Sequence, residues 1–155
     1  MRVMTKHFGE IELDESKIIN FPSGILGFDN YKEFTILYDN EEGERPDISW
    51  LQSIDEPSLA IPIMSPFLVM EEYNPEVEDE LLKPLGDMKP DNMIVLVSVT
   101  VPSDVTKLSA NMKAPFIINA ETKKGIQIII EKGDYEIKYH FYEKLAAIKE
   151  AKEGQ

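Results

Sequence analysis

The chain has 155 residues, with 16 Lys and Arg against 29 Asp and Glu, and its formal net charge is −13 at pH 7. This length suits one domain, residues 1–155, with a core of its own, and the absence of cysteine excludes disulfides, thiolate metal sites and thiol catalysis. An acidic surface repels phosphate groups, which disfavours direct binding to nucleic acid or an anionic membrane and favours a basic protein partner.

The first 28 residues predict short strands followed by a turn-rich loop. Residues 2–21 alternate apolar and polar side chains and are broken by Gly9 and by the polar turn at residues 14–16. In the loop at residues 21–28, two glycines permit positive φ, so we expect Ile25, Leu26 and Phe28 to pack back onto the core. Residues 29–34 predict a short helical turn, and residues 34–38 another strand.

The stretch at residues 48–64 predicts a hairpin at the centre of the core. Its apolar strands, residues 48–54 and 59–64, are separated by Asp55-Glu56-Pro57-Ser58, which favours a turn. The hairpin contains Trp50, the only tryptophan of the chain. Pro62 lacks an N–H, so we expect an edge or an irregular pairing at that position.

Two acidic elements flank this hairpin in the sequence. Residues 39–47 predict an exposed loop, and residues 71–80, EEYNPEVEDE, hold six acids and no base. Residues 67–70 predict a short strand, and residues 75–83 predict a helix with proline and acids in its first turn. If the fold brings the two elements together, they form a negative patch with Trp50 and Tyr73 nearby.

The C-terminal half predicts more strands and one terminal helix. Residues 93–101, MIVLVSVTV, predict a strand buried on both faces, and residues 116–119 pair with residues 126–130. Residues 135–142 alternate as a further strand, and residues 143–155 predict a helix. Many short strands with Gly and Pro turns indicate a mainly β protein, an antiparallel barrel or sandwich with one or two short helices.

No motif for catalysis or metal binding emerges from the residues. His7 and His140 lie in alternating strands without ligand spacing, and Gly24 to Gly27 lacks the lysine and hydroxyl residue of a phosphate loop. No serine is flanked as in a nucleophile elbow. We therefore expect no catalytic residue, no metal and no cofactor, and the absence of long apolar runs predicts a soluble, intracellular protein.

An ordered set of short motifs is more specific than any single residue. The set comprises Phe21-Pro22-Ser23-Gly24-Ile25-Leu26-Gly27-Phe28, Trp50-Leu51-Gln52-Ser53, Pro57, Leu59-Ala60-Ile61-Pro62, Pro66, Asn111-Met112-Lys113-Ala114-Pro115 and Gln127. In this order, over roughly residues 5 to 142, the chain resembles the flagellar assembly factor FliW family. The resemblance implies a small, antiparallel β-barrel-like, non-enzymatic cytoplasmic protein.

The resemblance also implies a partner switch in flagellum biogenesis and translation regulation. Such proteins bind the carbon storage regulator CsrA, an RNA-binding dimer that represses flagellin synthesis, and they bind flagellin itself, as an assembly chaperone would. The charge of −13 fits a basic partner. Strong like charge disfavours self-association, so we expect a monomer.

The partner-binding residues expected from the sequence are mostly acidic. The candidate residues are Trp50, Glu71, Glu72, Tyr73, Glu76, Glu78, Asp79 and Asn111. The acids are expected to act as rim charges, and Trp50 or Tyr73 as the anchor if exposed. Core packing is the alternative for Trp50, and a turn-forming role for Asn111. A different class of function also remains, a small barrel that binds a ligand or substrate in a cavity lined by Tyr135, Tyr139 and Phe141.

Overall fold

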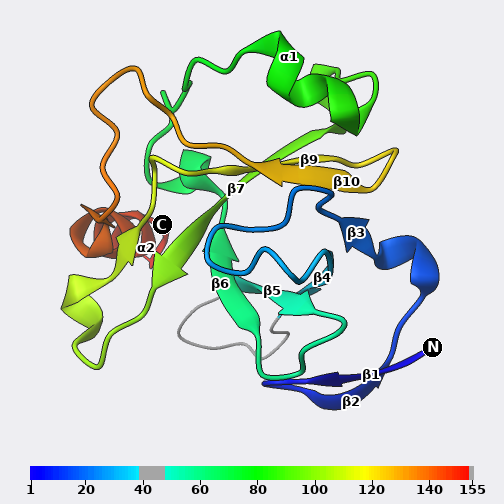
Figure 1. Ribbon diagram of the computed structural model, residues 1–155. Coiled ribbons are helices and arrows are strands. Elements are labelled where there is room, and N and C mark those ends of the chain that lie inside the picture. Colours follow the sequence, from blue (N-terminus) through cyan, green and yellow to red (C-terminus); the bar gives the residue numbers. More distant parts are fainter. Residues whose placement is uncertain (39–47, 154–155) are drawn as a thin grey trace.

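The computed structural model describes residues 1–38 and 48–153, with side chains through Ile148, and these residues form a mainly β structure (Figure 1). The strands are β1 Arg2–Thr5, β2 Gly9–Glu12, β3 Ile19–Asn20, β4 Glu33–Tyr38, β5 Ser49–Ser53, β6 Ala60–Met64, β7 Met93–Thr100, β8 Ser109–Ala110, β9 Phe116–Asn119, β10 Lys124–Gln127 and β11 Tyr139–His140. The α-helices are α1 Asp79–Leu82 and α2 Tyr142–Glu153. Short 3-10 helices span Glu15–Lys17, Pro66–Leu68, Lys83–Leu85, Pro90–Asn92 and Val105–Lys107.

Seven of the strands close into a barrel. Their order is β7-β6-β5-β4-β3-β10-β9, and β9 pairs again with β7. All neighbours run antiparallel except β3 and β10, whose parallel pairing is the single register Asn20 to Lys124. Because a closed barrel pairs each of its strands on both sides, it presents no sheet edge. The hairpin β1–β2 is a separate sheet, and β8 and β11 extend outward from β7.

The barrel interior is filled by aromatic and aliphatic side chains. The rings of Phe21 and Phe34 meet edge to face with centroids 5.7 Å apart, and Phe21 and Phe116 meet similarly at 6.1 Å. Leu51 and Ile63 complete this buried centre. Strand alternation points these side chains inward, as the period of two requires. The interior is therefore a packed core.

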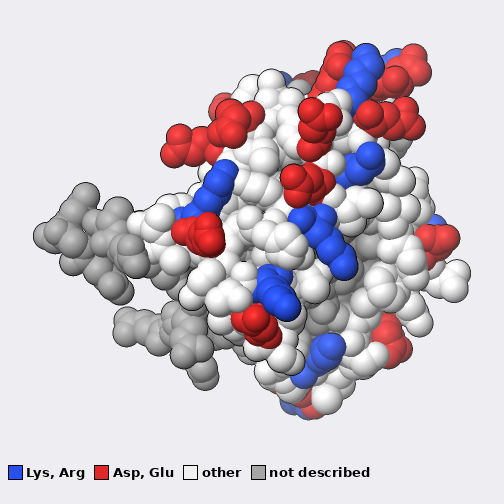
Figure 2. All heavy atoms as spheres, turned by 90° about the vertical axis from the view of Figure 1, so that its left-hand side faces the viewer, with Lys and Arg blue, Asp and Glu red and all other residues white. Residues whose placement is uncertain are grey.

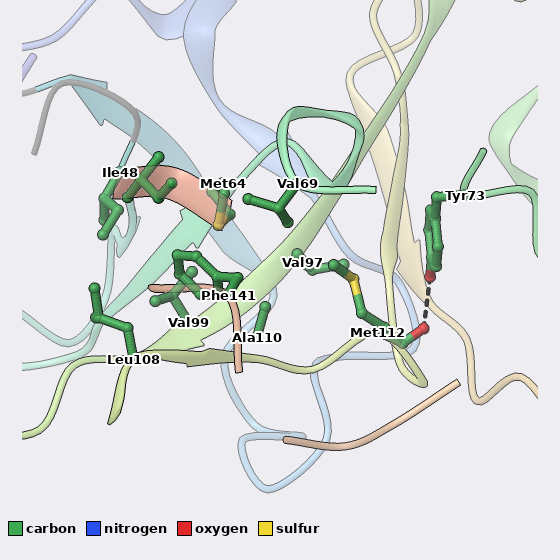
Figure 3. Close-up of a cluster of buried hydrophobic side chains, with 11 residues drawn as sticks. Ile48, Met64, Val69, Tyr73, Val97, Val99, Leu108, Ala110, Met112 and Phe141 are labelled. Atoms are coloured by element: carbon green, nitrogen blue, oxygen red, sulfur yellow. Dashed lines mark hydrogen bonds between the residues drawn. The ribbon is translucent and has the colours of Figure 1, made fainter. Parts of the chain in front are cut away.

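A second core lies on the outer side of β7. Its central residues, Val97, Met112 and Phe141, are completely buried, and Leu145 of α2 packs against them. Figure 3 shows these side chains with the hydrogen bond from Tyr73 to the carbonyl of Met112. Side chains in the middle of β7 also pack in the barrel, which confirms for this part the burial predicted from its apolar run, whereas Met93, Ile94 and Thr100 are exposed.

The local predictions from alternation hold for most strands. The structure confirms the strand at residues 34–38, the central hairpin as β5 and β6, and the terminal helix as α2. The predicted pairing of residues 116–119 is confirmed as β9 with β10, but β10 spans Lys124–Gln127, so residues 128–130 of the predicted strand lie outside it. Pro62 pairs with Trp50 on β5, while pairing with β7 begins only at Ile63. The missing N–H therefore coincides with an interrupted ladder, as expected.

Predictions for the acidic segment and its neighbours were wrong in detail. Residues 67–70 contain a 3-10 turn in place of a strand, because Pro66 starts a helical turn. The helix expected at residues 75–83 is reduced to α1, four residues long, and residues 74–78 have no regular structure. Exposed acids alone do not stabilise so short a helix, which needs a buried apolar face.

Three further predictions, for a loop, a helical turn and a strand, were wrong in whole or in part. Ile25 is buried as predicted, but Leu26 and Phe28 are 51% and 40% exposed. The helical turn expected at residues 29–34 is absent, because Glu33 already begins β4. The strand expected at residues 135–142 is reduced to β11, since only two of its residues find a partner in β8. The predicted loop at residues 39–47 lies outside the described residues.

Within the part of the chain that the structure describes, none of the helices combines the length and apolar character needed to cross a bilayer.

Candidate functional site

The irregular segment between the 3-10 turn at Pro66 and α1 forms one wall of a hollow on the barrel's outer side. This hollow of about 460 Å³ has apolar walls that include Phe67, Met93 and Val95, and Glu71 and Glu72 line it as well. Phe67 is 44% and Met93 38% exposed. The hollow thus joins accessible apolar surface to two carboxylates.

A second hollow lies beside the first and shares Val77 with it. It measures about 270 Å³ and is lined by the remaining residues Glu76, Glu78, Leu81, Ile128, Ile129, Glu131 and Lys132. Leu81 and Ile129 are exposed, at 41% and 53%. We call the two hollows and their lining residues the acidic face. Asp79, at the start of α1, lines neither hollow.

Charge on the acidic face is strongly negative. Five glutamates line the two hollows against one lysine, Lys132, whose ammonium lies 3.4 Å from the Glu76 carboxylate with both side chains exposed. Figure 2 shows acidic side chains gathered at the end of the molecule where α1 lies, with some Lys or Arg side chains and uncharged surface among them. Such a surface can dock a partner that presents both basic and apolar side chains.

Tyr73 is the buried member of the acidic face and is not an exposed anchor. It is 3% exposed, and its hydroxyl donates a hydrogen bond of 2.6 Å to the carbonyl of Met112. Its ring meets Tyr135 edge to face at 5.0 Å. Burial, and secondarily the neighbouring Tyr135, raises the pKa of Tyr73 above its ordinary value. Tyr73 therefore fixes the wall of the first hollow to the loop that contains Met112.

Replacing Tyr73 by Phe should lower the free energy of unfolding by about 1–3 kcal/mol at pH 7, because the Met112 carbonyl loses its buried partner. Since the folded state raises the pKa, the neutral phenol stabilises the fold below pH about 10, and this contribution is lost as pH rises further. Urea unfolding between pH 7 and 11 measures both effects. The control Tyr38→Phe, on a side chain that is 65% exposed, should change neither the free energy of unfolding nor its dependence on pH. Equal losses of free energy in both variants would contradict the role assigned to the Tyr73 hydroxyl.

Trp50 lies elsewhere, on the outer side of the barrel wall. It is partly buried, and the ring of His7 covers it with centroids 3.9 Å apart. Burial, and secondarily Lys6, lowers the pKa of His7. Trp50 belongs to none of the three buried clusters and lines neither hollow, so it is not part of the acidic face.

The polar residues of the ordered motifs hold loops together. Asn111 accepts a hydrogen bond from the N–H of Lys113, which supports its turn-forming alternative, and it is also absent from the acidic face. Gln127 accepts from the N–H of Leu26 and donates to the carbonyl of Ala114, which ties two motif loops to β10. A Cβ at Gly24 would lie 2.8 Å from Asp29, and its φ is +74°. These motif residues thus stabilise the loops and turns of the fold.

Sequence reasoning missed the apolar half of the acidic face. Phe67, Leu81, Met93, Ile129 and Glu131 were not candidates. One signal was available: in the run Ile128-Ile129-Ile130, alternation places the middle residue opposite its neighbours, and the structure buries the outer two while exposing Ile129. Nothing local distinguishes Met93 or Phe67 from the apolar residues around them.

The ordered motifs and the barrel both have counterparts in known proteins. A family model described as "FliW protein" matches residues 2–141. Relatives described as flagellar assembly factor FliW occur in Lachnoclostridium phytofermentans, 52% identical over all of this chain and 99% of the relative, and in Lachnospira eligens, 51% identical over 92% of this chain and 95% of the relative. A crystal structure of the flagellar assembly factor FliW superposes with a TM-score of 0.84 and 29% identity, covering 92% of this chain and 97% of that one.

Proposed function

The chain belongs to the FliW family of flagellar assembly factors, and from this premise we propose that it is a non-enzymatic, cytoplasmic regulator that binds the translational repressor CsrA. Binding relieves the repression of flagellin synthesis. When flagellin accumulates, it occupies the factor, and CsrA is free to repress again. In this proposal the factor acts as a monomer and makes no direct contact with nucleic acid.

The observation that supports this proposal is the combination of charge and apolar exposure on the acidic face. An RNA-binding dimer presents basic side chains, which five glutamates around two hollows complement. The exposed side chains of Phe67, Met93 and Ile129 supply apolar area that a partner can desolvate. Glu71, Glu72, Glu76 and Glu78 act as rim charges, which mainly set the association rate and its dependence on salt.

One of the residues expected from the sequence takes another role in this proposal. Tyr73 supports the acidic face as its buried member, because its hydroxyl is engaged with Met112. The anchor role passes to Phe67, whose ring meets that of Tyr73 at 6.2 Å and is 44% exposed. Aromatic side chains held in this way lose little conformational freedom on binding.

Titration calorimetry with purified CsrA tests the proposal. We expect binding at low salt that weakens at high salt, and loss of RNA capture by CsrA when the factor is present. A parallel titration with flagellin should show a complex, and pre-saturation with flagellin should restore RNA capture. Absence of binding to CsrA in either salt would overturn the proposal and leave the family membership without this partner.

A further inference from the structure

One mouth of the barrel forms a separate hollow of about 400 Å³. Its lining residues are Leu13, Lys17, Ile19, Thr35, Ile36, Tyr38, Ile94, Ile118, Ala120 and Lys123. Ile94 and Ile118 pair directly across β7 and β9, two positions from the pair Leu96 and Phe116; Ile118 belongs to the buried barrel core, whereas Ile94 is 36% exposed. The hollow therefore lies at one end of the barrel, next to the packed core.

Charge at this mouth is opposite to that of the acidic face. The described residues of its lining include two lysines and no carboxylate, although the chain as a whole has a net charge of −13. Among the described residues, neither Lys17 nor Lys123 forms a salt bridge. Hydrogen bonding from Ser16, and to a smaller extent the charge of Lys17, lowers the pKa of the Asp14 carboxylate, which therefore lies within electrostatic reach of this lysine. The carbonyl of Lys17 is held by the hydroxyl of Thr35 at 3.0 Å, which fixes the first lysine at the rim.

The second lysine occupies a backbone conformation that favours glycine. Lys123 has a φ of +58°, and among the described non-glycine residues it alone has a positive φ. Its N–H donates to the carbonyl of Asn119 at 2.9 Å, and its carbonyl accepts from the N–H of Asn20 at 2.8 Å. These bonds hold the turn between β9 and β10 in place. The turn thus holds the Lys123 side chain at the lining of the hollow.

We propose that this mouth binds an anionic amphiphile, an unbranched alkyl chain that ends in a carboxylate. The isoleucines receive the chain, and Lys17 and Lys123 pair with the carboxylate at the rim. A hollow of this volume with apolar walls and few polar groups at a barrel mouth suits a small ligand. A peptide fits less well, because the closed barrel has no strand edge to satisfy the peptide's N–H and C=O groups, whereas an alkyl chain has none to satisfy.

The test uses the full chain, labelled at isoleucine methyl groups, and sodium decanoate as the probe. We expect decanoate to shift the methyl resonances of Ile36, Ile94 and Ile118 and to leave Ile129 and Ile137 unchanged. Affinity should rise about fourfold per methylene from hexanoate to decanoate, because each methylene is removed from water. Decylamine, which has the same chain with a cationic head group, should bind at least tenfold more weakly.

Matched variants distinguish the effect of Lys17 and Lys123 on decanoate binding from the effect of overall charge. The double substitution Lys17→Gln and Lys123→Gln should weaken decanoate binding about tenfold, whereas Lys107→Gln with Lys138→Gln, on two exposed lysines outside the hollow, should not. Lys123→Gly should lose affinity without lowering the melting temperature, since glycine adopts a positive φ without steric cost.

Several results would overturn this site. They are shifts confined to Ile129 and Ile137, decylamine binding as tightly as decanoate, or equal losses in the two double variants. A peptide that binds the mouth when decanoate does not would also reject the small ligand. None of these outcomes depends on CsrA, so the site and the proposed function succeed or fail separately.

Discussion

Reversing the four rim charges of the acidic face should slow association with CsrA at least tenfold at low salt, and the difference should shrink toward twofold at high salt. The variant replaces Glu71, Glu72, Glu76 and Glu78 by Lys. Complementary charge raises association rates by about 10- to 1,000-fold, and salt screens this effect over about 10 Å at 0.1 M. All four side chains are exposed, so the substitutions should leave the fold intact. Stopped-flow mixing measures the rates.

A matched control distinguishes this face from the overall charge. Four other exposed acids, outside both hollows, can be reversed in the same way; they are Glu15, Asp29, Glu33 and Asp55. Each reversal adds two charges, so both variants have a net charge of −5 in place of −13. The control should change the association rate less than threefold. Equal slowing in the two variants would assign the effect to net charge, and an unchanged rate in the first would remove the acidic face from the interface.

Phe21→Ala should lower the free energy of unfolding by about 3–5 kcal/mol, the largest loss we expect from a single substitution in this chain. Phe21 is completely buried and contacts the rings of Phe34 and Phe116 edge to face. Gly125 lies against this ring so closely that a Cβ there would come within 2.6 Å of it. The barrel wall is thus shaped around Phe21 and cannot easily close over the space that alanine would leave. Urea unfolding at pH 7 measures the loss.

Phe28→Ala is the natural control, because both phenylalanines bound the same motif loop. Phe28 is 40% exposed and lies outside the three buried clusters. Its removal should cost less than about 1 kcal/mol. A loss for Phe28→Ala that equals the loss for Phe21→Ala would show that the loop, rather than the barrel core, determines stability.

The ordered motifs led to the family, yet Gln127, Gly24 and Asn111 act by joining loops and turns. They identify the fold without locating a binding surface. Of the eight candidate residues, the structure brings Glu71, Glu72, Tyr73, Glu76 and Glu78 to one face and leaves Trp50, Asp79 and Asn111 outside its hollows.

The sequence alone determined those features of this protein that depend on residues close together in the chain. Alternation along β4, β5, β6 and β7 and the turn residues between them predict strands, because side chains two positions apart share a face. The excess of acids follows from composition, and with it the preference for a basic partner. Each of these inferences depends on neighbours within a few positions.

Tertiary structure alone decided where those elements meet. Closure of β9 onto β7 brings Ile118 beside Ile94 and so creates the mouth with its two lysines. Packing of residues 66–82 against β7 and β9 brings Phe67 beside Met93. Such contacts join positions more than twenty residues apart and depend on strand register and on which faces are buried. No local pattern specifies them, because the same alternation is compatible with several pairings until the whole core is packed.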